Sequence, residues 1–268
     1  MSKTVQPPRL ALLLGLVAAL VASSACELAF TDLRAQSQDE WSRTYDLSPA
    51  GLVEVHNVNG AIDVEPSSDG KVHVRAERTA KAVSEAAAKD LLQKVEIVDQ
   101  VSPDRVRLET RGPRGVFGGG HYSVRYWISL PAGASVKVTN TNGRITLSDL
   151  SGAVEARTTN GGVAGRGLKG RIEASTTNGG IEMDVDEVDD DGIALETTNG
   201  GVRVALPGSA KADISASVTN GGIDTGDLRI EQIGEKSRRR LEGRLNGGGP
   251  RIRLETTNGG IQISDKRS

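Results

Sequence analysis

The chain has 268 residues, of which 37% are hydrophobic, 25% are charged and only 3% are aromatic, with a formal net charge of −2. A charge near zero argues against a nucleic-acid-binding protein, which carries a clustered basic surface. The single cysteine excludes a disulfide framework and a multi-thiolate metal site. Every aromatic residue lies before residue 128, so the later part of the chain must build its core from aliphatic side chains.

The first 25 residues have the order of a secretory signal. Lys3 and Arg9 precede an uncharged run over residues 10–22, and the small residues Ser23, Ser24 and Ala25 follow it. The run is too short to span ~30 Å of hydrocarbon. We therefore interpret residues 1–25 as a cleaved signal peptide of an exported protein.

Cys26 directly follows the small residues, as in bacterial lipoprotein precursors, which this segment resembles. That resemblance implies acylation of Cys26 and attachment to a membrane of the cell envelope, on its periplasmic or its surface face. Ser23 stands where such precursors usually have leucine. The alternative is ordinary cleavage after Ala25, which would leave a free thiol. We expect the lipid, with residues 26–46 as a lipid-anchored polar tether.

Residues 47–134 are predicted to hold a first repeat and a cap region. The stretch from about 80 to 93 is rich in Ala, Glu and Lys and has apolar residues at helical spacing, which predicts one short amphipathic helix. Strands are expected at 71–76, 94–98, 105–110 and 122–130. Because solenoids need capped ends, we expect this region to cover the N-terminal end of a repeat stack.

An Asn-Gly pair recurs along the chain, above all in the TNGG units of residues 135–268. The asparagines are Asn59, Asn142, Asn160, Asn178, Asn199, Asn220 and Asn258. Their spacings after Asn142 are 18, 18, 21, 21 and 38 residues, the last close to two periods with one degenerate unit. A period near 20 is typical of one coil of a solenoid.

Apolar residues alternate before each asparagine, as in Val154 and Ala156 or Ile172 and Ala174, which predicts a strand with one buried face. After the asparagine the alternation slips by one residue, because the next apolar residue comes three positions later. Glycine permits such a corner at low cost. The pattern favours a β-solenoid, although Asn-Gly is also typical of hairpins, and a stack of hairpins is the competing geometry.

The repeated asparagines share the parity of the buried residues and are therefore predicted to point inward. Stacked at ~4.8 Å, their amides can hydrogen-bond to one another in a ladder, so we interpret them as structural and not as ligand-binding residues. We expect the coils to stack in chain order, with residues 264–268, which include the charged Asp265, Lys266 and Arg267, protecting the last strand as an edge.

The order of these motifs resembles a bacterial family of adhesin-like domains of unknown function. The resemblance rests on VEVHNVNGAIDV, a short helix, YSVRYWISLPAGASVKV, the TTNGG units and NGGGPRIRLETTNGGIQI, and it covers roughly residues 45–265. It implies an all-β, single-domain β-solenoid outside the cytoplasm, often attached to a membrane. It brings no catalytic residues to this chain.

Candidate sites for chemistry are few. Glu187, Asp189 and Asp191 imitate the start of a calcium loop, but Thr198 stands where a bidentate Glu is needed, so we expect no metal and no cofactor. Outward columns such as Lys137, Glu155 and Glu173 leave open a carbohydrate-active enzyme that uses paired carboxylates. The three histidines form no ligand pair.

The favoured hypothesis is a non-enzymatic envelope lipoprotein whose rigid solenoid surface serves adhesion or contacts with an unknown envelope protein or glycan. One alternative is the carbohydrate-active β-helix enzyme with outward carboxylates. The other is an envelope-stress sensor whose tether relays an interaction at the membrane.

Overall fold

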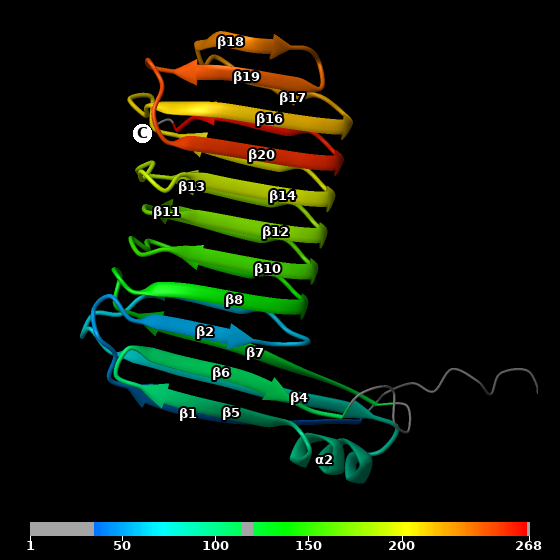
Figure 1. Cartoon of the computed structure of the whole chain (residues 1–268). Helices are drawn as coiled ribbons and strands as arrows, with labels where there is room; N and C mark the ends of the chain where they lie inside the picture. The colour runs from blue at the N-terminus through cyan, green and yellow to red at the C-terminus, as the bar shows by residue number, and fades with distance from the viewer. Residues whose placement is uncertain (1–34, 114–119, 267–268) are drawn as a thin grey trace, which may run out of the picture.

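The computed structural model describes residues 35–113 and 120–266, and its strands form two large sheets with the core between them (Figure 1). The first, here called sheet A, has the spatial order β1 (Ala35–Tyr45), β4 (Val72–Ala82), β7 (His121–Leu130), β3 (Ile62–Pro66), β9 (Ile145–Ser148), β11 (Val163–Leu168), β13 (Ile181–Val185), β15 (Val202–Leu206), β21 (Ile261–Asp265), β17 (Ile223–Asp224).

The second, here called sheet B, holds the strands that precede each corner. Its spatial order is β18 (Ile230–Lys236), β19 (Arg240–Leu245), β16 (Ala212–Asn220), β20 (Arg251–Asn258), β14 (Ile193–Asn199), β12 (Ile172–Asn178), β10 (Val154–Asn160), β8 (Ser135–Asn142), β2 (Leu52–His56), β6 (Arg105–Arg111), β5 (Glu96–Ser102). The predicted all-β solenoid with one short helix is confirmed.

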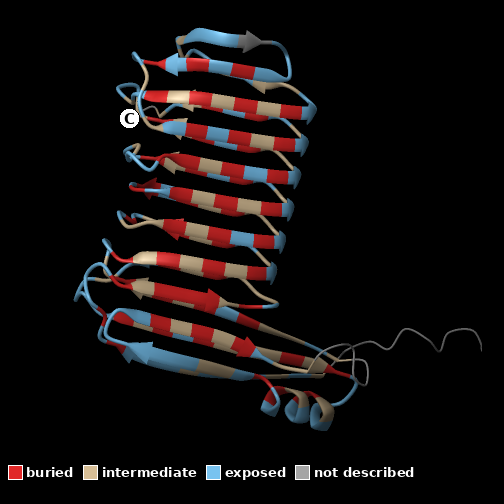
Figure 2. Cartoon of the chain, in the orientation of Figure 1, coloured by how far each residue is buried: buried red, intermediate tan, exposed pale blue. Residues whose placement is uncertain are grey.

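Each coil runs along sheet B, turns at an Asn-Gly corner and returns along sheet A. Neighbouring coils pair in parallel and in register, so that Val154 lies beside Ile172, and Ile172 beside Ile193. The inward residues form aliphatic columns that are almost fully buried, and Figure 2 shows the alternation of buried and less buried positions along the strands. The period of two in the sequence thus creates the core directly.

The N-terminal end departs from the simple coil. Strands β6 and β7 form a further coil below β2 and β3, and the Asn-Gly corner is absent there. Strand β4 pairs with β7, and β5 with β6, both antiparallel. Helix α2 (Glu85–Gln93) lies against β4 and β1 at this end of the molecule (Figure 1).

The helix is shorter than predicted, because residues 80–82 belong to β4. There Ala80 and Ala82 alternate with exposed or half-buried residues and fill the interior of a strand paired on both sides. The helix begins after Ser84, whose side chain accepts a hydrogen bond from the Ala87 amide at 3.2 Å. Ala-rich composition indicates helix, but here sheet pairing and the serine cap set the boundary.

Residues 35–45, predicted as part of the tether, instead form the edge strand β1. It pairs with β4 over its whole length, Trp41 packs against the core, and the Tyr45 hydroxyl donates to Asp99 at 2.9 Å. Its polar sequence shows no clear period because a long antiparallel partner and a few aromatic anchors hold it, not an alternating apolar face.

The C-terminal end corrects the expected order of the coils. The last coil, β20 and β21, is inserted between the β14–β15 coil and the β16–β17 coil (Figure 1). Strand β21 is therefore internal to sheet A and not a protected edge. The hairpin β18–β19 closes this end, with β19 antiparallel to β16. Identical corners allow this order because each coil presents equivalent columns to either neighbour.

Candidate functional site

The corner asparagines form one continuous hydrogen-bonded column, here called the asparagine ladder. In every step the Nδ2 of one asparagine donates to the Oδ1 of its neighbour at 2.7–2.9 Å. The spatial order is Asn59, Asn142, Asn160, Asn178, Asn199, Asn258, Asn220. This order follows the inserted coil and not the sequence.

The ladder lies on the exposed corner, which corrects the inward direction expected from parity. The five asparagines from Asn160 onward are exposed, and Asn59 and Asn142 are half-buried. The inward position nearest the corner is two residues earlier, where Thr158, Thr176, Thr197 and Thr256 are buried. The glycine corner turns the chain before the next inward position, so the asparagine reaches the surface.

The buried threonines form a second column that the sequence analysis missed. Each threonine hydroxyl donates to the corner glycine carbonyl of the preceding coil in the stack, and these bonds measure 2.8–3.3 Å. Asn140 takes the same place in its coil and donates to the Gly60 carbonyl at 2.8 Å. The recurrence of Thr at one inward position of the TTNGG unit was the available signal.

The two glycines of each TNGG corner have different roles. A Cβ at the first one, Gly179, would lie 2.0 Å from the Gly161 carbonyl oxygen, so the stacked corners exclude a side chain there. A Cβ at the second one, Gly180, would lie 3.4 Å from the Gly201 oxygen, an ordinary contact. At this corner only the first glycine is therefore required by the packing of the coils, and at other corners, such as Gly162 with 3.1 Å, the second glycine has less room.

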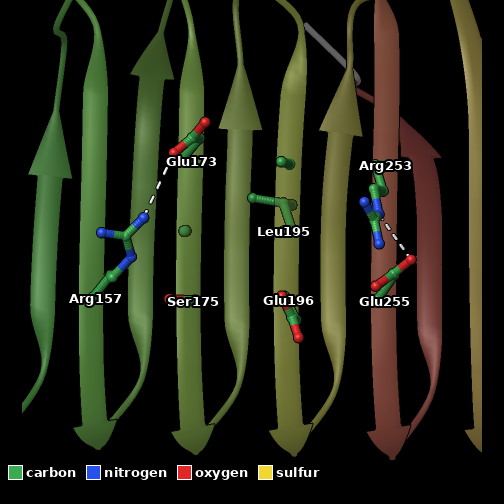
Figure 3. Close-up of a pocket in the computed structure, with 9 residues that line it drawn as sticks. Arg157, Glu173, Ser175, Leu195, Glu196, Arg253 and Glu255 are labelled. Atoms are coloured by element: carbon green, nitrogen blue, oxygen red, sulfur yellow. Dashed lines mark hydrogen bonds and ion pairs between the residues drawn. The ribbon is translucent and has the colours of Figure 1, made fainter.

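The outer face of sheet B carries charges in columns, as the register predicts. Lys137 Nζ lies 3.0 Å from Glu155, which also contacts Arg157, and Arg157 lies 3.8 Å from Glu173. Glu173 is paired with Arg171. Residues of neighbouring coils line an open depression on this face. In Figure 3 Arg157 is directed toward Glu173, and Arg253 lies beside Glu255, which it contacts at 2.8 Å.

These carboxylates are engaged by guanidinium groups of their own face. A general acid must carry a proton in the reacting complex, and a nucleophilic carboxylate must be free to attack. Glu155 and Glu173 lie on adjacent strands but are each paired with arginine. The arrangement favours a self-neutralised, rigid polar surface.

Glu54 is the most deeply buried carboxylate of this face. Burial alone would raise its pKa, but hydrogen bonds from His56 and Arg105 outweigh burial and hold the pKa below its ordinary value of 4.5. A carboxyl group with a lowered pKa stabilises the fold fully above the ordinary pKa. That contribution is lost as the pH falls through the lower, folded-state pKa.

The remaining predicted site residues are not gathered into a site. Cys26 lies outside the described residues. Glu187, Asp189 and Asp191 are exposed in a turn, where the Asp189 carboxylate accepts from the Asp191 amide at 3.0 Å. Within residues 35–113 and 120–266, no group of three or more His, Cys, Asp or Glu residues is placed to hold a metal.

His73 takes part in a local network at the N-terminal end. Its Nε2 lies 2.9 Å from the Asp69 carboxylate, and its Nδ1 lies 3.1 Å from the Thr44 hydroxyl. Thr44 and His73 are cross-strand partners of β1 and β4, so their contact follows from register. The hydrogen bond from His73 and one from the Lys71 amide lower the pKa of Asp69.

Among solved structures, a candidate cell adhesion protein from Clostridium sporogenes has a similar fold, with a TM-score of 0.51 and 15% identity over 86% of this chain and 100% of that one. A candidate adhesin from Bacteroides fragilis gives 0.39 and 17% over 86% and 98%. Another from Parabacteroides merdae gives 0.30 and 12% over 87% and 97%.

A search of curated proteins gives no match. In the described part of the chain, no helix has the length and apolar character needed to cross a membrane. The Toastrack DUF4097 family matches residues 53–264, which run from the first buried residue of β2 to the last residues of β21. The match therefore spans all seven Asn-Gly corners, and the chain belongs to the Toastrack DUF4097 family.

Proposed function

We propose that the chain is a non-enzymatic, lipid-anchored protein of the bacterial cell envelope that presents its stacked sheets as a rigid surface for adhesion or envelope contacts. In this proposal residues 1–25 are removed as a signal, Cys26 carries the lipid, and the segment before β1 is the tether. The tether is shorter than the sequence predicted, because β1 begins at residue 35.

The observation that carries the proposal is the continuous parallel stack with polar outer faces, of which the face of sheet B is largely self-paired. Its coils are fixed to one another by backbone pairing, by the buried threonine bonds and by the asparagine ladder. The depressions on sheet B are shallow and open, and charged side chains line them. Such a surface suits contact with a large partner better than enclosure of a small substrate.

An adhesion role is compatible with the description of the Clostridium sporogenes protein, which has the same fold. For the enzyme alternative, the pairing of Glu155 and Glu173 with arginines is unfavourable, because neither carboxylate is free. The envelope location rests on the order of charged, apolar and small residues before Cys26.

Cell fractionation tests the anchor. The parent protein should sediment with membranes, and Cys26→Ala should move it to the soluble fraction. A Ser24→Ala variant, which keeps the thiol, is the matched control and should stay with the membranes. Unchanged membrane retention of Cys26→Ala would contradict the lipid anchor.

Cross-linking on intact cells tests the contact role. We expect the anchored protein to recover a macromolecular partner of the envelope or of an opposing surface, and the recovery should fall when a bulky side chain is placed on the outer face of sheet A or sheet B. Recovery of no partner by the parent, together with turnover of a polysaccharide that Glu155→Gln abolishes, would favour the enzyme.

A further inference from the structure

The middle of the outer face of sheet A differs from sheet B in how its charges are satisfied. Arg144, Arg166 and Arg203 are exposed, and none has an ion pair within residues 35–113 and 120–266. Glu182 is likewise exposed and unpaired. On sheet B, by contrast, Arg157, Arg171 and Arg253 are each paired with a glutamate. Sheet A therefore offers free guanidinium groups.

Two of these arginines border a shallow depression that crosses several coils. It is lined by Arg144, Arg203 and Glu182, with the backbone of Gly162 and Gly180 and the side chain of Ala164 as its floor. Arg144 precedes β9 and Arg203 lies on β15, which places them three strand spacings or ~14 Å apart across the stack. Arg166 lies on β11, between them in the order of strands and on the same outer face, but two residues beyond Ala164 and outside the lining of the depression.

A ligand for this surface must carry separated acidic groups. Guanidinium groups bind carboxylates in a bidentate manner, and arginines on strands ~14 Å apart suit two separated acidic groups better than one small anion. An open depression also does not enclose a small molecule. The charge pattern therefore fits an extended polymer with carboxylates at intervals, lying along the axis of the stack.

Two features of this depression favour an acidic polysaccharide over an acidic peptide as the ligand. The floor has no free strand edge, because the Val163 and Ile181 amides donate to the Gly180 and Gly201 carbonyls of the next coil, so a peptide cannot pair as an added strand. The depression also lacks an apolar pocket for peptide side chains. Glu182 lies near these arginines and can accept hydrogen bonds from sugar hydroxyls, which an acidic peptide of glutamates does not offer.

The geometry points to a binding site for a carboxylate-bearing polysaccharide on the outer face of sheet A, with Arg144, Arg166 and Arg203 binding successive acidic groups and Glu182 accepting hydroxyls between them. This inference rests on the proposed contact role and names the chemistry of its partner.

The site is tested by measuring the binding of the full chain to polygalacturonate with calorimetry at low salt. The triple variant Arg144→Gln, Arg166→Gln, Arg203→Gln should bind at least about tenfold more weakly than the parent, since charge-assisted bonds are lost. The matched control variant removes the same number of positive charges from sheet B through Arg157→Gln, Arg171→Gln and Arg253→Gln. Its affinity should stay within about twofold of that of the parent. Melting curves of both variants verify that each is folded.

Polymer controls identify the ligand class. Neutral dextran should not bind, and poly-glutamate should bind more weakly than polygalacturonate. Equal losses in the two triple variants, no binding of polygalacturonate by the parent, or tighter binding of poly-glutamate would each overturn the inference. If polygalacturonate does not bind while cross-linking still recovers an envelope partner, only the polysaccharide site fails and the proposed contact role stands.

Discussion

The middle coils and the last coils of this protein use the same corner but different connectivity. From β8 to β15 each coil stacks on the one before it in the chain. At the C-terminal end β20 and β21 instead enter between two coils that precede them, and β16 is displaced outward. The hairpin β18–β19 then pairs with β16 as the outer layer of sheet B.

The difference teaches that the repeat determines which kind of coil can lie beside another. It does not determine which coil along the chain takes that place. Thr256 of the inserted strand lies in register with Thr197 on one side and with Val218 on the other. A TNGG coil therefore fits between any two similar coils, and the order is decided by the connections that flank it. If this is right, equivalent positions of the middle and inserted coils should respond alike to substitution.

The corner glycines should give the largest effect. Gly179→Ala in a middle coil would place a Cβ 2.0 Å from a carbonyl oxygen, and Gly259→Ala in the inserted coil would place one at 1.9 Å. Each substitution should lower the free energy of unfolding by about 5 kcal/mol or more. At the control positions Gly180 and Gly260 a Cβ would lie 3.4 and 3.5 Å from its nearest neighbouring atom. Gly180→Ala and Gly260→Ala should therefore lower the free energy of unfolding by less than about 1 kcal/mol. Urea unfolding measures both pairs, and tolerance of Gly259→Ala would show a loosely seated last coil.

Core leucines should give the next largest effect. Leu195 and Leu254 are neighbours in one column and are 1% and 0% exposed. Leu195→Ala and Leu254→Ala should each lower the free energy of unfolding by about 2–5 kcal/mol, through lost burial and the cavity left behind. A much smaller cost for Leu254→Ala would mean that the inserted coil contributes little to the core.

Removal of a buried threonine hydroxyl should have a moderate effect. Thr176→Val and Thr256→Val keep the shape but delete the 2.8 Å bonds to the Gly161 and Gly200 carbonyls. Each should cost about 1–2 kcal/mol, because a carbonyl loses its side-chain partner. Thermal melts of the two variants should agree, and a neutral result at both positions would remove the threonine column from the account of stability.

The asparagine ladder should give the smallest effect, because its amides are exposed and water can replace a lost partner. Asn178→Ala and Asn258→Ala should cost about 0.5–1 kcal/mol each. Thr177→Ala, at an exposed position beside the ladder, is the control and should change stability by less than about 0.5 kcal/mol. Equal effects of the control and the asparagine variants would contradict a stabilising ladder.

Local pattern predicted the coil well. The alternation before each asparagine and the slip of one residue after it led to the two sheets, the corner and the aliphatic columns, because each depends on residues close in the sequence. The outward charge columns, such as Lys137, Glu155 and Glu173, followed from the same register.

Features that depend on distant partners were not predictable in this way. Strand β1 is held by β4, and the inserted coil by strands that are remote in sequence, so neither leaves a local period. The exposed direction of the asparagines depends on how early the glycine turns the chain. Whether an outward arginine is paired depends on the charges that neighbouring coils place beside it, so the local sequence does not mark Arg144, Arg166 and Arg203 as unpaired.

Cysteine pairing tests the inserted coil most directly. In a Cys26→Ser background, Thr198→Cys with Thr257→Cys places thiols on adjacent strands β14 and β20, which suits a disulfide, whereas Thr198→Cys with Thr219→Cys leaves β20 between them. We predict rapid intramolecular oxidation of the first pair and none of the second. Oxidation of the 198–219 pair without the 198–257 pair would show that the coils stack in chain order and would contradict the account.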